Sequence, residues 1–266
     1  MKRVLVLILS LALVMCIAIP ALAADDVVIY DFTNTADVDD TFGFNTGLTT
    51  SFGVPAPTVT IENGQMKMLF NHAIAGGYLR AESRSWVATL AEKAADYKYL
   101  RLYVENNTSA AFAISFIFQD AATGWGSADM TKAVLINTKG EKVTGTVRPD
   151  YNGFTNGYIE LPAGFKGWLF MDTNVSTFGP GPDGWGKTAL NAWSDVTFIE
   201  WDIRDAAADG EGYMIWDDLA LVNEAAAPEA SEPGTDNPGN GGDISMLLYA
   251  AAAVSGLGAL AIRRKK

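Results

Sequence analysis

Short stretches in which apolar and polar residues alternate recur along most of this 266-residue chain, and this period of two limits its fold more than any other feature. The pattern is clear from Lys98 to Val104 and from Ala111 to Phe118, where every second residue is Leu, Val, Ile or Phe. Because successive side chains of a strand point to opposite faces, both stretches predict strands with one face in a core. Thr58–Glu62 and Gln65–Phe70 alternate in the same way around Asn63-Gly64, a strong hairpin signal.

One stretch departs from this rhythm. Ser85 to Asp96 places Trp86, Leu90 and Ala94 at helical spacing and predicts one short helix. The other apolar stretches predict strands at Val27–Thr33, Gly77–Glu82, Lys132–Asn137, Glu141–Thr146, Gly157–Glu160, Phe165–Asp172, Thr197–Arg204 and Tyr213–Val222. A dozen or so short strands without alternating helices predict an all-β fold in which two sheets form a sandwich.

The N-terminal end has the composition of a secretory signal peptide. Residues 1–23 begin with Lys2 and Arg3, continue through an apolar region and end in small residues, so the mature chain is expected to start near Asp25. The alternative is a retained membrane anchor. The only cysteine, Cys16, lies inside this segment, so the mature chain has no disulfide.

The C-terminal end combines an uncharged apolar segment, residues 244–262, with a basic tail, residues 263–266. At about 1.5 Å per residue such a helix can just cross a hydrocarbon core, and the basic tail then stays in the cytoplasm. Together with Asn237–Asp243 these segments resemble the wall-sorting signals of Gram-positive surface proteins, although the Thr that a sortase attacks is missing. The resemblance implies a tether, in the membrane or the cell wall, on the extracellular face of a bacterial cell.

Between the two ends lie a folded region and a spacer. Residues 224–243 are rich in Ala, Pro, Gly, Asn and acidic residues and hold no aromatic residue, which predicts a flexible linker. Residues 25–223 are then expected to form one β-sandwich domain.

The exposed part of the chain is strongly acidic. Six of the 19 Lys and Arg residues lie in the two end segments, which hold no Asp or Glu. The remainder therefore carries 13 basic against 31 acidic residues, a net charge of about −18. Such a surface repels phosphate backbones, so nucleic acid is not expected as a partner.

Four phrases of the domain carry a family resemblance: Tyr30-Asp31-Phe32, Leu100–Asn106, Leu161–Trp168 and Ile215–Val222. Together they are similar to the jelly-roll modules of the carbohydrate-binding and galactose-binding-like kind in secreted bacterial proteins. The resemblance implies a jelly-roll sandwich and an extracellular glycan as ligand.

Sugar binding in such modules relies on aromatic rings that stack on pyranose C–H faces. Trp168, Trp201 and Trp216 lie within strand patterns and are expected to pack in the core or on a sheet. Trp86 and Trp193 are expected to cover the sandwich.

Two tryptophans differ from the rest, because Trp125 and Trp185 each lie between two glycines in a polar stretch. Glycines favour a turn that presents the ring, although each ring could instead fold back over the core. The predicted ligand site consists of Trp125, Trp185, Asp120, Asp129, Asp183 and Lys187.

A structural calcium ion is a further expectation from the resemblance, since related jelly rolls often hold one where the first and last strands meet. Asp31 and Asp217 match those positions. The alternative is that both are exposed carboxylates at strand ends, because Ca²⁺ takes six or more oxygen ligands and only two side chains are identified.

Glu200-Trp201-Asp202-Ile203-Arg204-Asp205 resembles the Glu-x-Asp-x-x-Glu pattern of laminarinase-type β-glucanases, with Asp in place of the last Glu. The resemblance implies that Glu200 and Asp202 share a strand face and could serve as catalytic carboxylates. Arg204 shares that face, which suits a surface ion pair equally well.

The sequence therefore predicts a tethered, non-catalytic glycan-binding domain. The alternatives are a structural or adhesive surface protein that binds another protein and, third, a surface glycoside hydrolase. The three functions require different geometries of the site. A glycan binder presents its loop tryptophans, a coat protein buries them, and an enzyme opens a cleft around its carboxylates.

Overall fold

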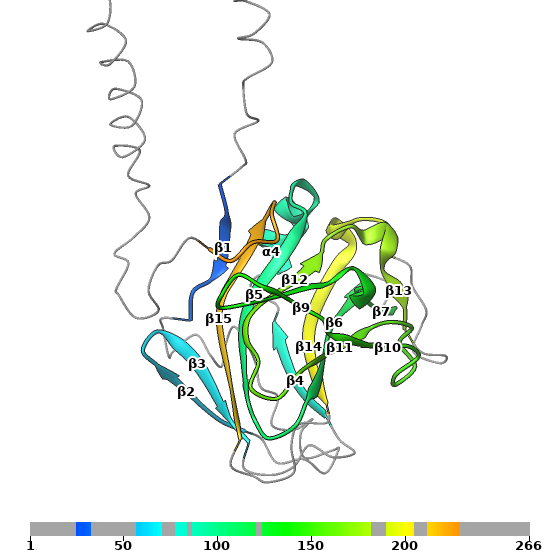
Figure 1. The fold of residues 1–266 in the computed structure, drawn as a ribbon. Coiled ribbons are helices and arrows are strands. Elements are labelled where there is room, and N and C mark those ends of the chain that lie inside the picture. Colours follow the sequence, from blue (N-terminus) through cyan, green and yellow to red (C-terminus); the bar gives the residue numbers. More distant parts are fainter. Residues whose placement is uncertain are drawn as a thin grey trace, which may run out of the picture. The chain divides into compact units, whose positions relative to one another are not determined.

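The computed structural model describes residues 25–32, 57–70, 78–83, 87–120, 124–181, 190–204 and 212–228. Contacts divide the chain into two units, Met1–Ala230 and Ser231–Lys266, and every described residue belongs to the first. There the strands form two antiparallel sheets that lie face to face (Figure 1). The predicted all-β sandwich of two sheets is confirmed.

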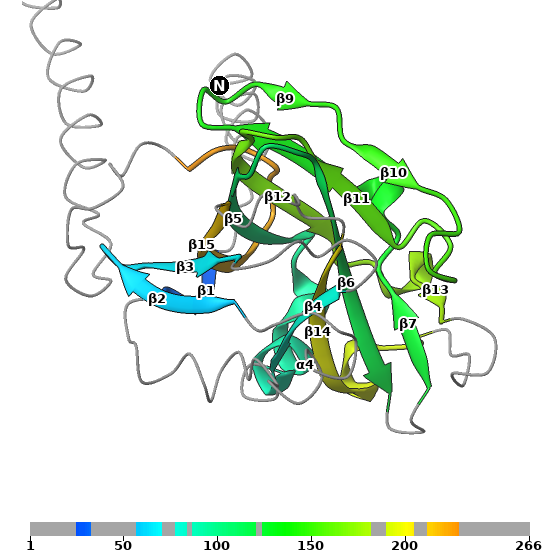
Figure 2. The ribbon, with the colours of Figure 1, turned by 90° about the horizontal axis from the view of Figure 1, so that it is seen from below.

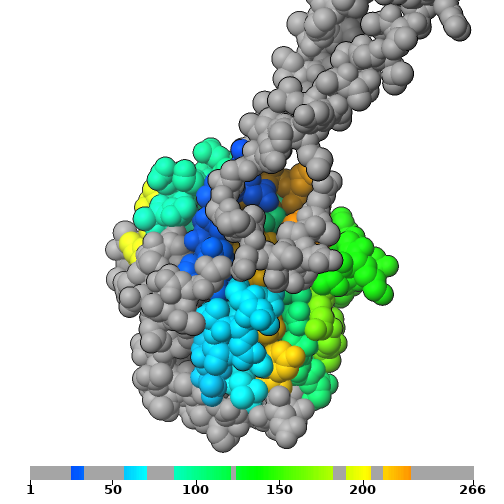
Figure 3. Space-filling model, turned by 90° about the vertical axis from the view of Figure 1, so that its left-hand side faces the viewer, coloured from blue at the N-terminus to red at the C-terminus, as the bar shows by residue number. Residues whose placement is uncertain are grey.

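The first sheet, sheet A, contains the first and last strands of the domain. Its order is β2 (Thr58–Glu62), β3 (Gln65–Leu69), β15 (Tyr213–Val222), β5 (Tyr99–Asn107), β12 (Lys166–Asp172), β8 (Val134–Asn137) and β9 (Lys142–Val143), and β1 (Val27–Tyr30) also pairs with β15. The β2–β3 hairpin turns at Asn63 and Gly64, whose φ angles of 55° and 75° confirm the predicted turn. Figure 3 shows β1 and this hairpin beside β15.

The two longest strands of the second sheet, sheet B, lie side by side at its centre. Its order is β10 (Thr146–Arg148), β11 (Tyr158–Leu161), β6 (Phe112–Asp120), β14 (Val196–Arg204) and β4 (Tyr78–Ser83), with β7 (Trp125–Ser127) pairing both β6 and β13 (Gly179–Pro180). The short 3₁₀ helices are η1 (Ala94–Asp96), η2 (Met130–Lys132), η3 (Val175–Thr177) and η4 (Trp193–Asp195).

Aromatic side chains fill the core between the sheets. Trp201 of sheet B and Trp216 of sheet A are both 0% exposed, and their rings meet edge to face at 6.0 Å. Trp193 is also buried and packs against Phe116. The predicted packing role of these three tryptophans is confirmed, and Trp168, half-buried on the outer face of sheet A, packs on a sheet as the sequence also predicted.

The one predicted helix is confirmed over its described residues. α4 (Val87–Lys93) continues into η1, and Leu90 and Ala94 are buried at the helical spacing that the sequence showed. The helix packs against η4 and β14 and so covers one end of the core. Trp86 lies outside the described residues.

The chain ends of the domain are joined by a buried arginine on sheet A. Arg101, 7% exposed, pairs with Asp26 at 2.9 Å and with Asp218 at 2.8 Å. Asp218 has a φ of 49° and lies at the irregularity where β15 changes register against β5. Because both partners are charged, this bridge ties β1 to β15 and holds the bulge in place.

The predicted strand at Glu141–Thr146 is interrupted in the structure. The chain leaves sheet A after β9 and joins sheet B at β10, so the segment crosses between the two layers (Figure 2). Gly145 lies at the crossing, where a Cβ would come within 2.6 Å of Ile159 Cδ1. The absent side chain lets the crossing backbone lie directly on the core.

The folded part reaches beyond the boundary expected at Asn223. Ala225 and Ala227 pack against the outer face of sheet A, beside Phe170 and Val222. The rest of the predicted linker, residues 229–243, and the two end segments lie outside the described residues. Among the helices that the structure describes, none combines the length and apolar composition needed to span a membrane.

The close approach of β12 to β8 gives a stability test. A Cβ at Gly167 would lie 2.0 Å from the carbonyl oxygen of Ile136, a backbone atom that the β8–β12 pairing holds in place. We expect Gly167→Ala to lower the free energy of unfolding by about 3 kcal/mol in denaturant titrations. The matched control is Gly164→Ala, where φ is +72° but the added Cβ meets nothing within 4 Å. It should cost about 1 kcal/mol, and equal costs would contradict this reading.

Candidate functional site

The side of sheet B that faces away from the core carries a set of polar and aromatic side chains. The β6–β14 register places Glu200 opposite Ile117, and Asp202 opposite Ser115. Because side chains alternate, Trp201 enters the core while Glu200 and Asp202 lie on the outer face, as the sequence predicted.

A hydrogen-bonded network connects two strands, β11 and β14, and a loop on this face. The Tyr158 hydroxyl of β11 bonds to the Asp202 carboxylate, and Arg204 Nε donates to Asp202 Oδ2 at 3.0 Å and to the Tyr158 oxygen at 3.1 Å. Asn152, with its amide oxygen turned toward Arg204, accepts from Nη1 at 3.1 Å. The network fixes the 149–157 loop above the sheet.

Burial and charge set the protonation of this network. Burial, and then the charge of Asp202, raise the pKa of Tyr158 well above its ordinary value, so the phenol keeps its proton and donates it to the carboxylate. Burial alone would lower the pKa of Arg204, but the charge of Asp202 and the bond to Tyr158 outweigh it, and that pKa is raised. Within the network, Tyr158 therefore remains a neutral phenol that is bonded to the anionic Asp202 and the cationic Arg204.

This state offers a substrate no direct access to the two carboxylates. Glu200 and Asp202 are each 1% exposed, and Asp202 is held by Tyr158 and Arg204. A glycosidase needs one carboxyl group that reaches the leaving oxygen and can give up a proton. The geometry favours a positioning role for Asp202.

Aromatic side chains pack around Tyr158 of this network. Ala113, Ile117, Phe154 and Tyr158 make a buried group, called here the outer-face cluster, and Trp125 and Tyr151 pack half-buried against it. The Tyr151 ring meets Tyr158 edge to face at 5.0 Å.

The 149–157 loop holds its rings through an unusual backbone. Asp150, Asn152 and Asn156 all have φ angles between 52° and 56°, the left-handed region that Asn and Asp tolerate. Tyr151 and Phe154 form an isolated antiparallel β-bridge. Arg148 Nε donates to Glu160 at 2.7 Å, and the Arg148 guanidinium lies 5.0 Å from the centroid of the Tyr151 ring. Such strained conformations persist where the surrounding contacts fix them, and they cluster at binding sites.

Trp125 lies on a strand and not in the expected loop. It begins β7, and its carbonyl oxygen accepts from the Gly181 amide. Gly126 allows this pairing, since a Cβ there would be 2.7 Å from the Gly179 oxygen. The Trp125 ring meets Phe198 edge to face at 5.8 Å and remains half-buried. The residue thus lies between β6 and the β13 segment, on the outer face of sheet B.

The other predicted ligand residues have local roles or lie outside the described residues. Asp120 Oδ1 accepts from the Gly124 amide at 2.7 Å, directly before β7. Asp129 Oδ1 accepts from the Thr131 amide at 3.0 Å and caps η2. Asp183, Trp185 and Lys187 all fall in residues 182–189, which the structure does not describe.

Sequence reasoning missed the 149–157 loop. Tyr151, Asn152 and Phe154 belong to a stretch with two Asn-Gly pairs, the same combination of aromatic and turn residues that singled out the Trp125 region. The same criterion, applied to the whole sequence, selects these three residues as well. The link from Asn152 to Arg204 is a contact between distant segments, which no local pattern reveals.

Asp31 and Asp217, the predicted calcium ligands, are electrostatically close. Burial, together with the charges of Asp218 and Asp31, raises the pKa of Asp217 to about 6, even though Gln65 and the Asp218 amide donate to it. Over the described part of the chain, no group of three or more His, Cys, Asp or Glu side chains is arranged to hold a metal ion. The described carboxylates alone do not meet the six or more oxygens that Ca²⁺ takes.

The raised pKa of Asp217 predicts a pH dependence of stability. Its folded value of about 6 exceeds its ordinary 3.8, so the folded protein binds this proton more tightly than the unfolded chain. The free energy of unfolding should therefore fall as the pH rises from about 4 to 6, by up to about 3 kcal/mol. Asp217→Asn should be more stable than wild type at pH 7.5 in EDTA and nearly equal to it at pH 3.5. Thermal melts at the two pH values measure this.

If a calcium ion binds at Asp31 and Asp217, Asp217→Asn should be less stable than wild type in Ca²⁺ buffer. The melting temperature of the wild-type protein would then rise with Ca²⁺, and Asp217→Asn would abolish the rise. Lower stability of Asp217→Asn in EDTA at pH 7.5 would contradict the electrostatic account.

Comparisons with known proteins give no family. No protein-family model and no curated protein matches the sequence. Among solved structures, the agarase AgWH50C is similar over 76% of this chain at 9% identity and a TM-score of 0.40, and this chain spans about a quarter of it, 25%. A family 30 carbohydrate-binding module is similar over 73% of this chain and 81% of its own at 11% identity, with a TM-score of 0.32. Likenesses this distant leave the function to be argued from the site.

Proposed function

We propose that this chain is a non-catalytic glycan-binding protein whose ligand lies on the outer face of sheet B. The observation that carries the proposal is the pair of half-buried rings, Trp125 and Tyr151, packed on one outer-face cluster. Aromatic rings with one face accessible stack on the C–H faces of pyranose sugars, and nearby polar groups bond their hydroxyls. Arg148 and Glu160, both partly exposed beside Tyr151, are such groups.

The network beneath the rings supports binding by fixing their positions. Tyr158 contacts the ring of Tyr151 and is itself bonded to Asp202 and Arg204. A site whose rings are already ordered loses less conformational entropy when the ligand arrives. Display of many copies on one surface would let a weak single site suffice.

The setting of the domain is part of the proposal. The apolar segment 244–262 with its basic tail, and the signal-like residues 1–23, support display on the outside of a bacterial cell through a membrane or wall tether. A calcium ion near Asp31 and Asp217 is the one cofactor considered. A protein partner in place of a glycan is the main alternative function, and the binding test separates the two.

The test is a glycan array probed with residues 25–230, a fragment that contains every described element. Trp125→Ala and Tyr151→Ala should each weaken binding of a glycan hit by about 2 kcal/mol, roughly thirtyfold. Trp125→Phe should restore part of it, because it keeps an aromatic face. Affinities are measured by calorimetry, with the fold of each variant checked by its melting temperature.

Trp168→Ala is the matched control. Trp168 is equally half-buried, contacts Tyr103 at 5.4 Å, and lies on the outer face of the other sheet. It should bind like wild type. If the array is silent, or if Trp168→Ala loses binding while Trp125→Ala retains it, the proposed site is wrong. If the domain binds a protein ligand and no glycan, the adhesive alternative is favoured.

A further inference from the structure

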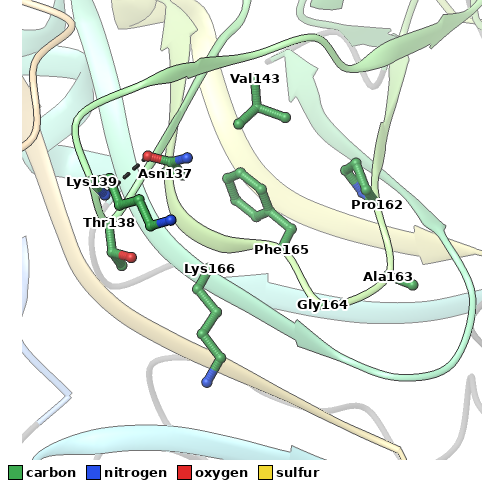
Figure 4. Close-up of a pocket in the computed structure, with 9 residues that line it drawn as sticks. All are labelled: Asn137, Thr138, Lys139, Val143, Pro162, Ala163, Gly164, Phe165 and Lys166. Carbon is green, nitrogen blue, oxygen red and sulfur yellow. Dashed lines mark hydrogen bonds between the residues drawn. The ribbon is translucent and has the colours of Figure 1, made fainter.

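A separate groove lies where two turns at the edge of sheet A meet (Figure 4). The β8–β9 turn contributes Asn137 and Lys139, and the β11–β12 turn contributes Pro162 and Phe165. The groove encloses about 330 Å³, which is within the range of small-ligand sites. In Figure 4 the Phe165 ring lies between the two turns, with Val143 on one side of it. The floor is therefore apolar and the rim polar.

Buried hydrogen bonds hold one wall of the groove in place. Asn106 is 0% exposed, and its Nδ2 donates to the carbonyl oxygens of Leu161 at 3.0 Å and Pro162 at 2.9 Å. The Gly164 amide donates to the backbone carbonyl oxygen of Asn106 at 2.9 Å, and the φ of Gly164 is 72°. This turn is fixed to β5 and does not need a ligand to order it.

The opposite wall is held in the same way. Asn137 Oδ1 accepts from the amides of Lys139 at 2.9 Å and Glu141 at 3.0 Å, so one side chain closes the whole β8–β9 turn. The Thr138 amide donates to the Lys166 oxygen at 3.1 Å and joins the two walls. Both walls of the groove are thus fixed before any ligand binds, which favours specific binding.

Positive charge is concentrated at this groove in an otherwise acidic domain. Lys139 is exposed and forms no ion pair with any residue that the structure describes, while Lys166 pairs with Glu105 at 2.8 Å. A second groove of about 310 Å³ adjoins the first at Val143 and is lined by Lys142. The nearby acids are Glu105 and Glu141, so the local balance of three lysines against two acids is positive, whereas residues 25–223 carry a net charge of about −13.

We propose that this groove binds a carboxylate-bearing saccharide, that is, a chain containing uronic acid residues. The carboxylate would lie at Lys139 and near Lys166, where ammonium groups attract it in a partly enclosed site. The sugar's C–H face would rest on Pro162, which is partly exposed, while Phe165, 6% exposed, supports the turn from the core. Asn137 and Thr138 would bond the sugar's hydroxyls. Lys142 in the adjoining groove would meet the next acidic residue of the chain. The groove shares no residue with the outer face of sheet B, so it is a second site with its own chemistry.

The test uses residues 25–230 and two probes, trigalacturonate and the neutral cellotriose, with amide shifts followed by NMR. Trigalacturonate should shift the amides of residues 137–143 and 163–166, and its affinity should fall between low salt and about 0.2 M NaCl. Lys139→Glu should weaken it by about fivefold or more. Lys132→Glu is the matched control, because Lys132 is exposed, makes the same charge change and lines neither groove. It should bind like wild type.

Three outcomes would overturn the proposal: no shifts with trigalacturonate, equal binding of cellotriose in the groove, or equal losses in the two lysine variants. The failure of this proposal is distinguishable from failure of the sheet B site. Trp125→Ala should leave trigalacturonate binding in the groove unchanged, and Lys139→Glu should leave unchanged the binding of a neutral glycan to sheet B.

Discussion

The pairing of β6 with β14 is the constraint on which the rest of the domain depends. These strands are buried on both sides, so each must supply a core residue and an outer residue in strict alternation. Trp201 packs against Phe116 of the same sheet at 5.0 Å and joins the two sheets through its edge-to-face contact with Trp216. The neighbouring Asp202 consequently points the other way and anchors Tyr158. A shift of one residue would exchange the core tryptophan for a buried carboxylate, which makes this register costly to change.

The buried charges of the domain act mainly as positioning devices. A buried ion pair gives little net stability, because desolvation offsets much of its attraction, but leaving one partner alone is costly. Asp202 and Arg204 hold the 149–157 loop over sheet B, and Arg101 in the same way ties the first strand to the last. Each ion pair thus adds a fixed polar contact to a segment that also packs through apolar side chains, Phe154 in the loop and Val27 and Ile29 in the first strand.

Local patterns predicted the elements well, and long-range contacts account for what they missed. The turn at Asn63-Gly64, the helix through Leu90 and the shared face of Glu200 and Asp202 all follow from the spacing of neighbouring residues. The glycines around Trp125 indicated a loop, whereas Gly126 serves the approach of β13, a strand more than fifty residues away. The loop over sheet B and the groove at Phe165 likewise depend on pairings between distant segments, so only the structure shows them.

The central claim is that the outer face of sheet B receives the ligand, and the indole N–H signals of the tryptophans test it most directly. Residues 25–230 labelled with ¹⁵N would be titrated with a neutral glycan identified on the array, and each indole signal assigned by substitution. The account predicts a saturable shift for Trp125 with none for Trp168 or the buried Trp201. A shift confined to Trp168, or no shift at Trp125 while the glycan binds, would contradict it.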